Sequence, residues 1–130
     1  MSRRSYLGGR QRGRDPCPDP DPETVVQRQF DAYNAKDMEA FLATYAPAVE
    51  MRDLPSNDLL RSEHDELRAF YETRFSNANL RAELVARSML GNMVVDTERL
   101  TGFDDGRVLD IVAFNEVRDG LIRRCWFVHA

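Results

Sequence analysis

The sequence has few of the residues that small proteins use for covalent or metal cross-links. Its 130 residues include only two cysteines, Cys17 and Cys125, with no Cys-x-x-Cys pair. The two histidines, His64 and His129, have no third ligand at a recognisable spacing. We therefore expect free thiols in a reducing, cytoplasmic environment, and neither a metal site nor a cofactor.

Long apolar runs and phosphate-binding glycine loops are also missing. No stretch of about 18 apolar residues occurs, so we expect a soluble chain without a membrane-spanning helix. The net charge of −4 hides an asymmetry, because five arginines give the first 14 residues a charge of +5 and leave −9 for the rest. Such an acidic body is a poor electrostatic match for nucleic acid. We expect neither nucleic acid nor a membrane as a partner.

The first 22 residues differ in composition from the rest. They are rich in arginine, glycine and proline and have no apolar periodicity. Such a composition cannot offset the conformational entropy that is lost on ordering. We expect residues 1–22 to form an unstructured leader and residues 23–130 to form one domain, whose first helix begins near Asp21-Pro22.

Helical periodicity dominates the first half of this domain. Apolar residues recur at helical spacing in three segments, which are Val26 to Tyr33, Met38 to Tyr45 and Leu67 to Phe75. Between the second and the third, residues 49–54 alternate between apolar and polar, which predicts a short strand that ends near Asp53.

From Leu80 onward the period of the pattern falls to two. Strands are predicted at 80–90, 93–103, 107–117 and 121–129, and two of the breaks between them hold Asp-Gly turns that are typical of hairpins. The order helix, helix, strand, helix and four strands predicts an α+β fold. Three helices should pack on one face of a curved, mostly antiparallel sheet.

Several of these segments resemble one family. Val25 to Arg28, Asn34 to Asp37, Tyr45 to Asp53 and Arg118 to Ile122 are similar to the SnoaL-like branch of the nuclear transport factor 2 superfamily, which includes ketosteroid isomerase. The resemblance covers residues 23–129 and implies a cone-shaped domain with a small-molecule pocket. It does not name a reaction, because this fold hosts isomerases, cyclases, dehydratases, hydrolases and inert binding proteins.

The resemblance to ketosteroid isomerase assigns three roles to positions in the chain. The aspartate that moves the proton falls on Asp53, the oxyanion-binding tyrosine falls on Gln29, and the second aspartate falls on or near Ala113. Loss of one oxyanion donor typically costs about 2.7 to 4 kcal/mol of transition-state stabilisation. The two substitutions therefore argue against authentic steroid isomerisation.

Asp53 is the residue that we expect to carry chemistry, as a general base at the mouth of an apolar cone. The alternative is that its carboxylate only caps the following turn. The expected substrate contacts are Gln29, Tyr33, Asn115 and Trp126. For Asn115 the alternative is a structural hydrogen bond within the sheet, and for Trp126 it is packing in the core or at a dimer face.

Charged residues at 81–87 and 96–99 interrupt two of the predicted strands. Cross-strand ion pairs on a solvent-facing or dimer-facing surface would explain them. The alternative is that Glu98 supplies a second carboxylate to the pocket.

Two functions fit these expectations. The first is a cofactor-free isomerase, dehydratase or hydrolase that acts on a small, largely apolar organic molecule with Asp53 as general base. The second is a ligand-binding or scaffold protein of the same fold without catalysis. A homodimer through the sheet is also expected, because helices cover only one sheet face and apolar residues on the other would be left in water. These residues come from the set Val108, Val112, Phe114 and Trp126 or Phe127.

Overall fold

The first helix, α2 (Pro22–Ala35), begins slightly before the predicted domain boundary. The computed structural model describes residues 18–130, so most of the expected leader, including Cys17, lies outside the described residues. The carboxylate of Asp21 accepts a hydrogen bond of 2.8 Å from the backbone N–H of Thr24, and Pro22 occupies the first turn. The helix ends where Lys36 adopts a left-handed conformation with φ of 59°.

Two further helices follow at α3 (Met38–Leu42) and α4 (Glu63–Phe75). Helix α3 is shorter than the predicted apolar stripe from Met38 to Tyr45, because Tyr45 already belongs to the first strand. Helix α4 begins with a contact that satisfies a backbone donor at its start, since the N–H of Ser62 donates to the carboxylate of Glu66 at 2.7 Å.

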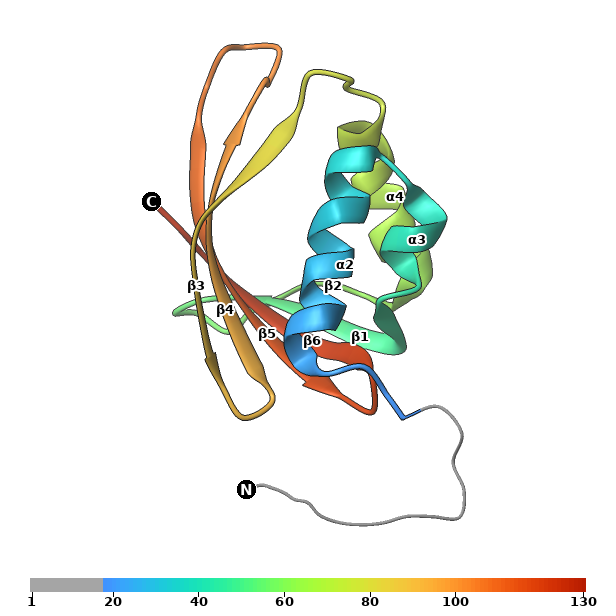
Figure 1. Cartoon of the computed structure of the whole chain (residues 1–130). Coiled ribbons are helices and arrows are strands. Elements are labelled where there is room, and N and C mark those ends of the chain that lie inside the picture. Colours follow the sequence, from blue (N-terminus) through green and yellow to red (C-terminus); the bar gives the residue numbers. More distant parts are fainter. Residues whose placement is uncertain (1–17) are drawn as a thin grey trace.

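The strands form one six-stranded sheet in the order β2-β1-β6-β5-β4-β3 (Figure 1). All neighbouring pairs are antiparallel except β1 and β6, which are parallel. The strands are β1 (Tyr45–Asp53), β2 (Leu59–Ser62), β3 (Arg81–Leu90), β4 (Met93–Thr101), β5 (Leu109–Arg118) and β6 (Leu121–His129).

The helices lie together on one side of the bent sheet, as Figure 1 shows. Between the two layers lies a core of fully buried side chains, which include Val26, Phe41, Met51, Leu67 and Ile122. This arrangement confirms the predicted α+β fold with three helices on a curved, mostly antiparallel sheet. The last four strands agree with the predicted ones to within two residues at most ends, whereas β2 was not predicted.

One predicted turn shows the backbone that Asp-Gly sequences favour. Asp119 and Gly120 both have positive φ, at 54° and 77°, between β5 and β6. A different constraint acts at Gly102, just after β4. Its φ is 93°, and a Cβ atom there would lie 1.9 Å from the carbonyl oxygen of Asn79. Only glycine fits this close approach, which holds the loop after α4 against the end of β4.

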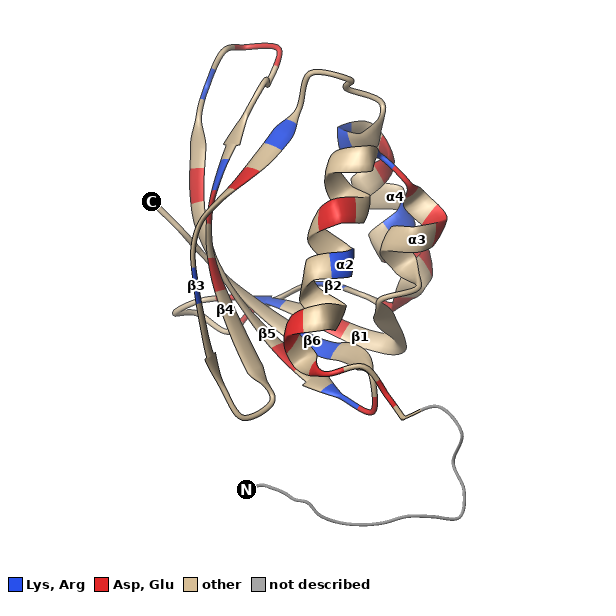
Figure 2. Cartoon of the chain, in the orientation of Figure 1, with Lys and Arg blue, Asp and Glu red and all other residues tan. Residues whose placement is uncertain are grey.

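Charges of both signs are interspersed over helices and strands of the described domain (Figure 2). Several form ion pairs on the surface, such as Arg99 with Asp110 at 2.8 Å and Arg124 with Glu116 at 3.1 Å. Among the described helices, none is long and apolar enough to cross a membrane.

Candidate functional site

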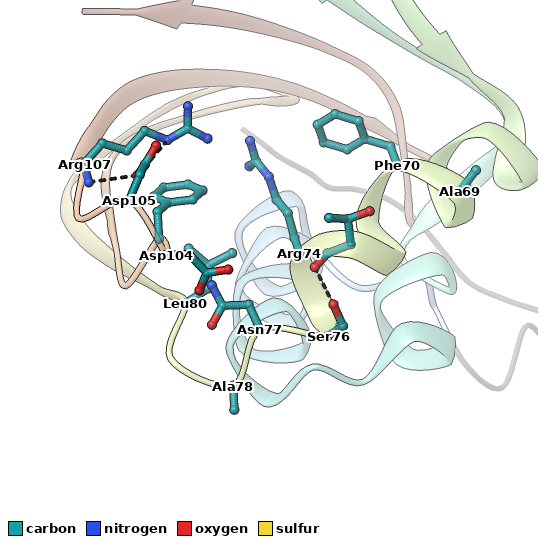
Figure 3. A pocket seen from close by; sticks show the side chains of 12 residues that line it. Ala69, Phe70, Arg74, Ser76, Asn77, Ala78, Leu80, Asp104, Asp105 and Arg107 are labelled. Carbon is teal, nitrogen blue, oxygen red and sulfur yellow. Dashed lines mark hydrogen bonds and ion pairs between the residues drawn. The ribbon is translucent and has the colours of Figure 1, made fainter.

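Two adjoining hollows lie between the helices and the sheet. An inner cavity of about 260 Å³ is lined by residues of α2, α4 and five strands. An outer cleft of about 870 Å³ lies between the end of α4 and the loop after β4. In Figure 3, Phe70 and Arg74 extend from α4 and Arg107 extends from the loop toward the same space. The two hollows share Phe70 and Arg74, so the cleft adjoins the cavity there.

The inner cavity has mostly apolar walls and a small set of polar groups. Its walls are contributed by Tyr45, Leu60, Phe70, Tyr71, Leu100, Leu109, Ile111, Ala113 and Phe127. The polar side chains among them are Gln29, Tyr33, Arg61, Arg74, Glu98, Asn115 and His129. A concave, largely apolar site with a few convergent polar groups is typical of small-molecule binding. The cleft is wider, but most of its lining is exposed.

Glu98 is the carboxylate of this cavity. It lies on the inward face of β4, where its register partner on β5 is Ile111, another cavity residue. Burial raises the pKa of Glu98 to about 7, the nearby charge of Asp96 adds to the rise, and Arg87 opposes it. Of the two sequence interpretations of Glu98, the pocket carboxylate is therefore the one observed. A carboxyl group with this pKa can both accept and release a proton near neutral pH.

A buried ion pair lies two residues from Glu98 along β4. Asp96 is fully buried and receives two hydrogen bonds from the guanidinium of Arg87, at 2.7 Å and 2.9 Å. Arg87 also donates to Gln27 of α2 at 2.8 Å. The surface interpretation of these charges is thus wrong for Arg87 and Asp96, because the pair points to the helix side. It joins β3 and β4 to α2 and holds the strand that carries Glu98.

Tyr33 of α2 supplies a hydroxyl without a partner. Its side chain is only 6% exposed, and among residues 18–130 nothing forms a hydrogen bond with its hydroxyl. The ring is held by edge contacts with Tyr71 and Phe75, at centroid distances of 6.2 Å and 5.5 Å. Burial raises the pKa of Tyr33 to about 12, with Arg74 acting against the rise. The hydroxyl therefore stays protonated at neutral pH and is free to donate to a ligand.

Two arginines line the cavity without a carboxylate partner. Arg61 of β2 lies over the ring of Phe70 at 3.7 Å, and its buried Nε has no hydrogen-bond partner in the described part of the chain. Arg74 of α4 lies 5.1 Å from the centroid of the same ring. Neither guanidinium is within ion-pair distance of a described acidic side chain.

Three of the predicted substrate contacts come together at the cavity, namely Gln29, Tyr33 and Asn115. Asn115 also makes the structural contacts given as its alternative, because its amide nitrogen donates to Val94 at 3.3 Å and its oxygen accepts from Cys125 at 3.4 Å. The binding role of all three stays a prediction.

Asp53 and Trp126 are not among the residues that line the cavity. The carboxylate of Asp53 accepts a hydrogen bond of 2.8 Å from Ser56, and its carbonyl accepts one of 2.7 Å from Asn57, in the turn after β1. The indole N–H of Trp126 donates to Asn57 at 3.2 Å. The structure thus gives Asp53 the turn contact that was its alternative, and its role as general base stays a prediction without geometric support.

The two arginines were missed as site residues, for different reasons. Arg74 had a visible signal, because it follows Phe70 and Tyr71 at helical spacing and so falls on the apolar stripe of α4. Arg61 had no such signal, because it lies on β2, a strand of four residues that the sequence pattern did not predict.

Three helices on one face of a curved six-stranded sheet form a fold of the nuclear transport factor 2-like type. A family model described as the SnoaL-like domain matches residues 26–125. The chain therefore belongs to the SnoaL-like family. No curated protein matches the chain in sequence.

Solved structures share the fold at low sequence identity. A cystatin-fold protein from Novosphingobium aromaticivorans superposes with a TM-score of 0.74 at 18% identity, over 84% of this chain and 98% of that one. A proposed ketosteroid isomerase from Kribbella flavida gives a TM-score of 0.71 at 20% identity, over 84% and 77%. A proposed polyketide cyclase from Sinorhizobium meliloti gives 0.69 at 19%, over 81% and 94%. These similarities establish the fold.

Proposed function

We propose that this protein binds a small, largely apolar organic molecule in the inner cavity and catalyses a cofactor-free proton transfer on it, with Glu98 as the acid–base group. The proposal rests on one observation. Glu98 lines an apolar cavity together with Tyr33, whose hydroxyl has no hydrogen-bond partner within residues 18–130. A base whose pKa lies near the working pH and a preorganised donor are the two groups that enolisation of a carbonyl compound needs.

The proposed step is an enolisation. The carboxylate of Glu98 removes a proton from the carbon next to a substrate carbonyl. The electron pair of the broken C–H bond forms a C=C bond, and the π pair of the carbonyl moves onto its oxygen. The hydroxyl of Tyr33 donates a hydrogen bond to the oxyanion that develops. In a β,γ-unsaturated substrate, return of the proton to the γ-carbon completes a double-bond isomerisation. In a β-hydroxy substrate, loss of the hydroxyl as water, protonated by the same carboxyl group, completes a dehydration.

The size of the cavity restricts the substrate. At about 260 Å³ it is smaller than the roughly 300 to 1,000 Å³ of sites for drug-sized ligands. A molecule with one ring fits this space better than a steroid with four. The positions that the resemblance gave to the missing isomerase donors, Gln29 and Ala113, do line the cavity, and they support a pocket rather than steroid chemistry.

Hydrogen–deuterium exchange tests the proposal without knowledge of the natural substrate. Cyclic ketones and keto acids with one ring are incubated with the protein in D₂O, and NMR follows exchange of the protons next to the carbonyl. Wild-type protein should accelerate the exchange. The rate of exchange with Glu98→Gln should be about 10²-fold to 10⁴-fold lower than with wild type. Glu83→Gln on the exposed part of β3 is the matched control and should exchange like wild type.

The same experiment decides between the two carboxylates and the non-catalytic alternative. If Asp53→Asn loses the exchange and Glu98→Gln keeps it, the base is Asp53, as the sequence predicts. Saturable binding without any acceleration of exchange would instead identify a ligand-binding protein, because binding alone stabilises the fold by RT ln(1 + [L]/Kd) and leaves the ligand unchanged.

A further inference from the structure

We infer that the ligand of the inner cavity is an organic anion, a carboxylate joined to a single apolar ring, and that Arg61 and Arg74 bind the carboxylate. This inference deepens the proposed function by naming the substrate class of the same cavity. It rests on the charges of the cavity and on the absence of a carboxylate partner for either guanidinium group among the described residues.

The cavity contains an excess of positive charge. Arg61 and Arg74 are its two permanently charged groups, and Glu98 is its one described acidic residue. The carboxyl group of Glu98 is only partly ionised at neutral pH, so it does not balance two guanidinium groups. Asp96, two residues from Glu98, is engaged with Arg87. An anionic ligand would restore the balance.

The state of Arg61 indicates where such an anion binds. Its Nε is buried and has no hydrogen-bond partner among residues 18–130, although buried polar groups are normally paired. One face of the guanidinium is covered by Phe70 at 3.7 Å, with Tyr71 and Phe127 at 5.5 Å and 5.9 Å. These ring contacts hold the guanidinium at the cavity wall. A planar fork of N–H donors matches the two oxygens of a carboxylate.

The second arginine lies where the cavity meets the cleft. Arg74 lines both hollows and contacts the rings of Phe70 and Phe103, at 5.1 Å and 5.7 Å. A carboxylate entering from the cleft meets this guanidinium before it reaches Arg61. The apolar part of the ligand is then left to face Leu100, Ile111 and Phe127, which line the interior.

Binding of benzoate to the full-length chain tests the inference. Benzoate, benzyl alcohol and benzylamine have the same ring and differ in charge, so isothermal titration calorimetry at neutral pH separates the contribution of the carboxylate. Benzoate should bind at least about tenfold more tightly than benzyl alcohol, and benzylamine should bind most weakly. Equal affinities of benzoate and benzyl alcohol would overturn the inference.

Variants locate the binding site. Arg61→Met and Arg74→Met should each weaken benzoate binding at least about tenfold and change the affinity for benzyl alcohol by less than about threefold. Arg81→Met on the exposed part of β3 and Arg107→Met in the cleft alone are the controls, and both should bind like wild type. Loss of binding in Arg107→Met with retention in Arg61→Met would place the anion in the cleft and overturn the inference.

Two readouts keep the test independent of folding and of catalysis. If Arg61→Met does not fold, nuclear Overhauser effects between benzoate and the rings of Phe70 and Phe127 in wild type decide the site, and their absence counts against it. Glu98→Gln should still bind benzoate. Benzoate binding without ketone exchange would support the anion site and refute the proton transfer. Ketone exchange without tighter binding of benzoate than of benzyl alcohol would support the proton transfer and refute the anion site.

Discussion

Two carboxylates on the same face of β4 have opposite environments. Asp96 forms a bidentate ion pair with Arg87, whose side chain is only 9% exposed. Glu98, two residues further on, faces the cavity and forms no ion pair with a described residue. Environment alone thus gives one carboxylate a structural role and leaves the other able to exchange protons, a separation that acid–base sites in proteins commonly use.

The raised pKa of Glu98 predicts a pH-dependent effect on stability. The folded protein holds this proton more tightly than the unfolded chain, in which the pKa is near the ordinary 4.5 rather than about 7. The stabilising contribution is therefore complete below about pH 4.5 and is lost as the pH rises to about 7. Relative to wild type, Glu98→Gln should gain about 2 kcal/mol of unfolding free energy between about pH 5 and about pH 8.

Urea unfolding at the two pH values measures this gain. Glu83→Gln, which also removes one carboxylate, is the control and should show no such change with pH. A difference between Glu98→Gln and wild type that is the same at both pH values would show that Glu98 titrates normally in the folded protein.

At the scale of elements, the site depends on the loop that joins α4 to β3. Asn77 in this loop donates its side-chain N–H to the carbonyl of Gly102 at 3.0 Å, and the backbone of Asn79 comes close to the α-carbon of the same glycine. These contacts hold the end of α4 against the end of β4. Arg74 lies in the last turn of α4, and Glu98 lies three residues before the end of β4. These two contacts at Gly102 help to set the relative position of Arg74 and Glu98.

Gly102→Ala should accordingly be far more damaging than its size suggests. The added methyl would collide with the carbonyl of Asn79, and positive φ disfavours any side chain. We expect a loss of about 2 kcal/mol or more in unfolding free energy, measured by urea denaturation. Gly91→Ala is the matched control, because φ there is 61° but no atom lies within 4 Å. It should cost about 1 kcal/mol, and equal losses would contradict the steric argument.

At the scale of the whole molecule, the outer face of the sheet has no helix over it. Val95, Phe114 and Trp126 are neighbours across β4, β5 and β6, and they alternate with residues that point to the core. Val112 and Val128 are paired beside them. Val108, from the set expected at this face, is exposed, whereas Phe127 lines the cavity instead. We propose that the outer face forms a homodimer, because it joins apolar side chains from three strands.

Light scattering tests the dimer. The wild-type protein at micromolar concentration should give a mass of about 30 kDa, twice the 15.0 kDa of the chain. Phe114→Lys should give a monomer, because a charge would be buried at the centre of the interface. Ala40→Lys on the exposed side of α3 is the control and should remain dimeric. A wild-type mass near that of one chain would refute the interface.

Features set by local sequence were predictable, and features set by distant contacts were not. The stripes of α2 and α4 and the Asp119-Gly120 turn depend on neighbouring residues, so periodicity and turn chemistry predicted them. The parallel pairing of β1 with β6 has no local signal. Alternation left the direction of Glu98 open between two faces, and only the pairing of β4 with β5 resolved it. Asp53 was expected in the pocket because the resemblance to ketosteroid isomerase gave it the role of the proton-moving aspartate, whereas the turn contact that the structure shows was the alternative.

The parallel pairing of β1 with β6 also affects how the chain folds. Strands β3, β4 and β5 form a meander with short-range contacts, whereas the register partners Tyr45 and Ile122 lie far apart in sequence. Closing this long loop costs entropy before the contacts are gained, and such topologies fold slowly. Strand β6 joins β5 through the tight Asp119-Gly120 turn, so the pair of β1 and β2 has to dock on β6 to complete the sheet. The cavity takes walls from β1, β2 and β6 as well as from β4 and β5, so it is complete only once this long-range pairing has formed.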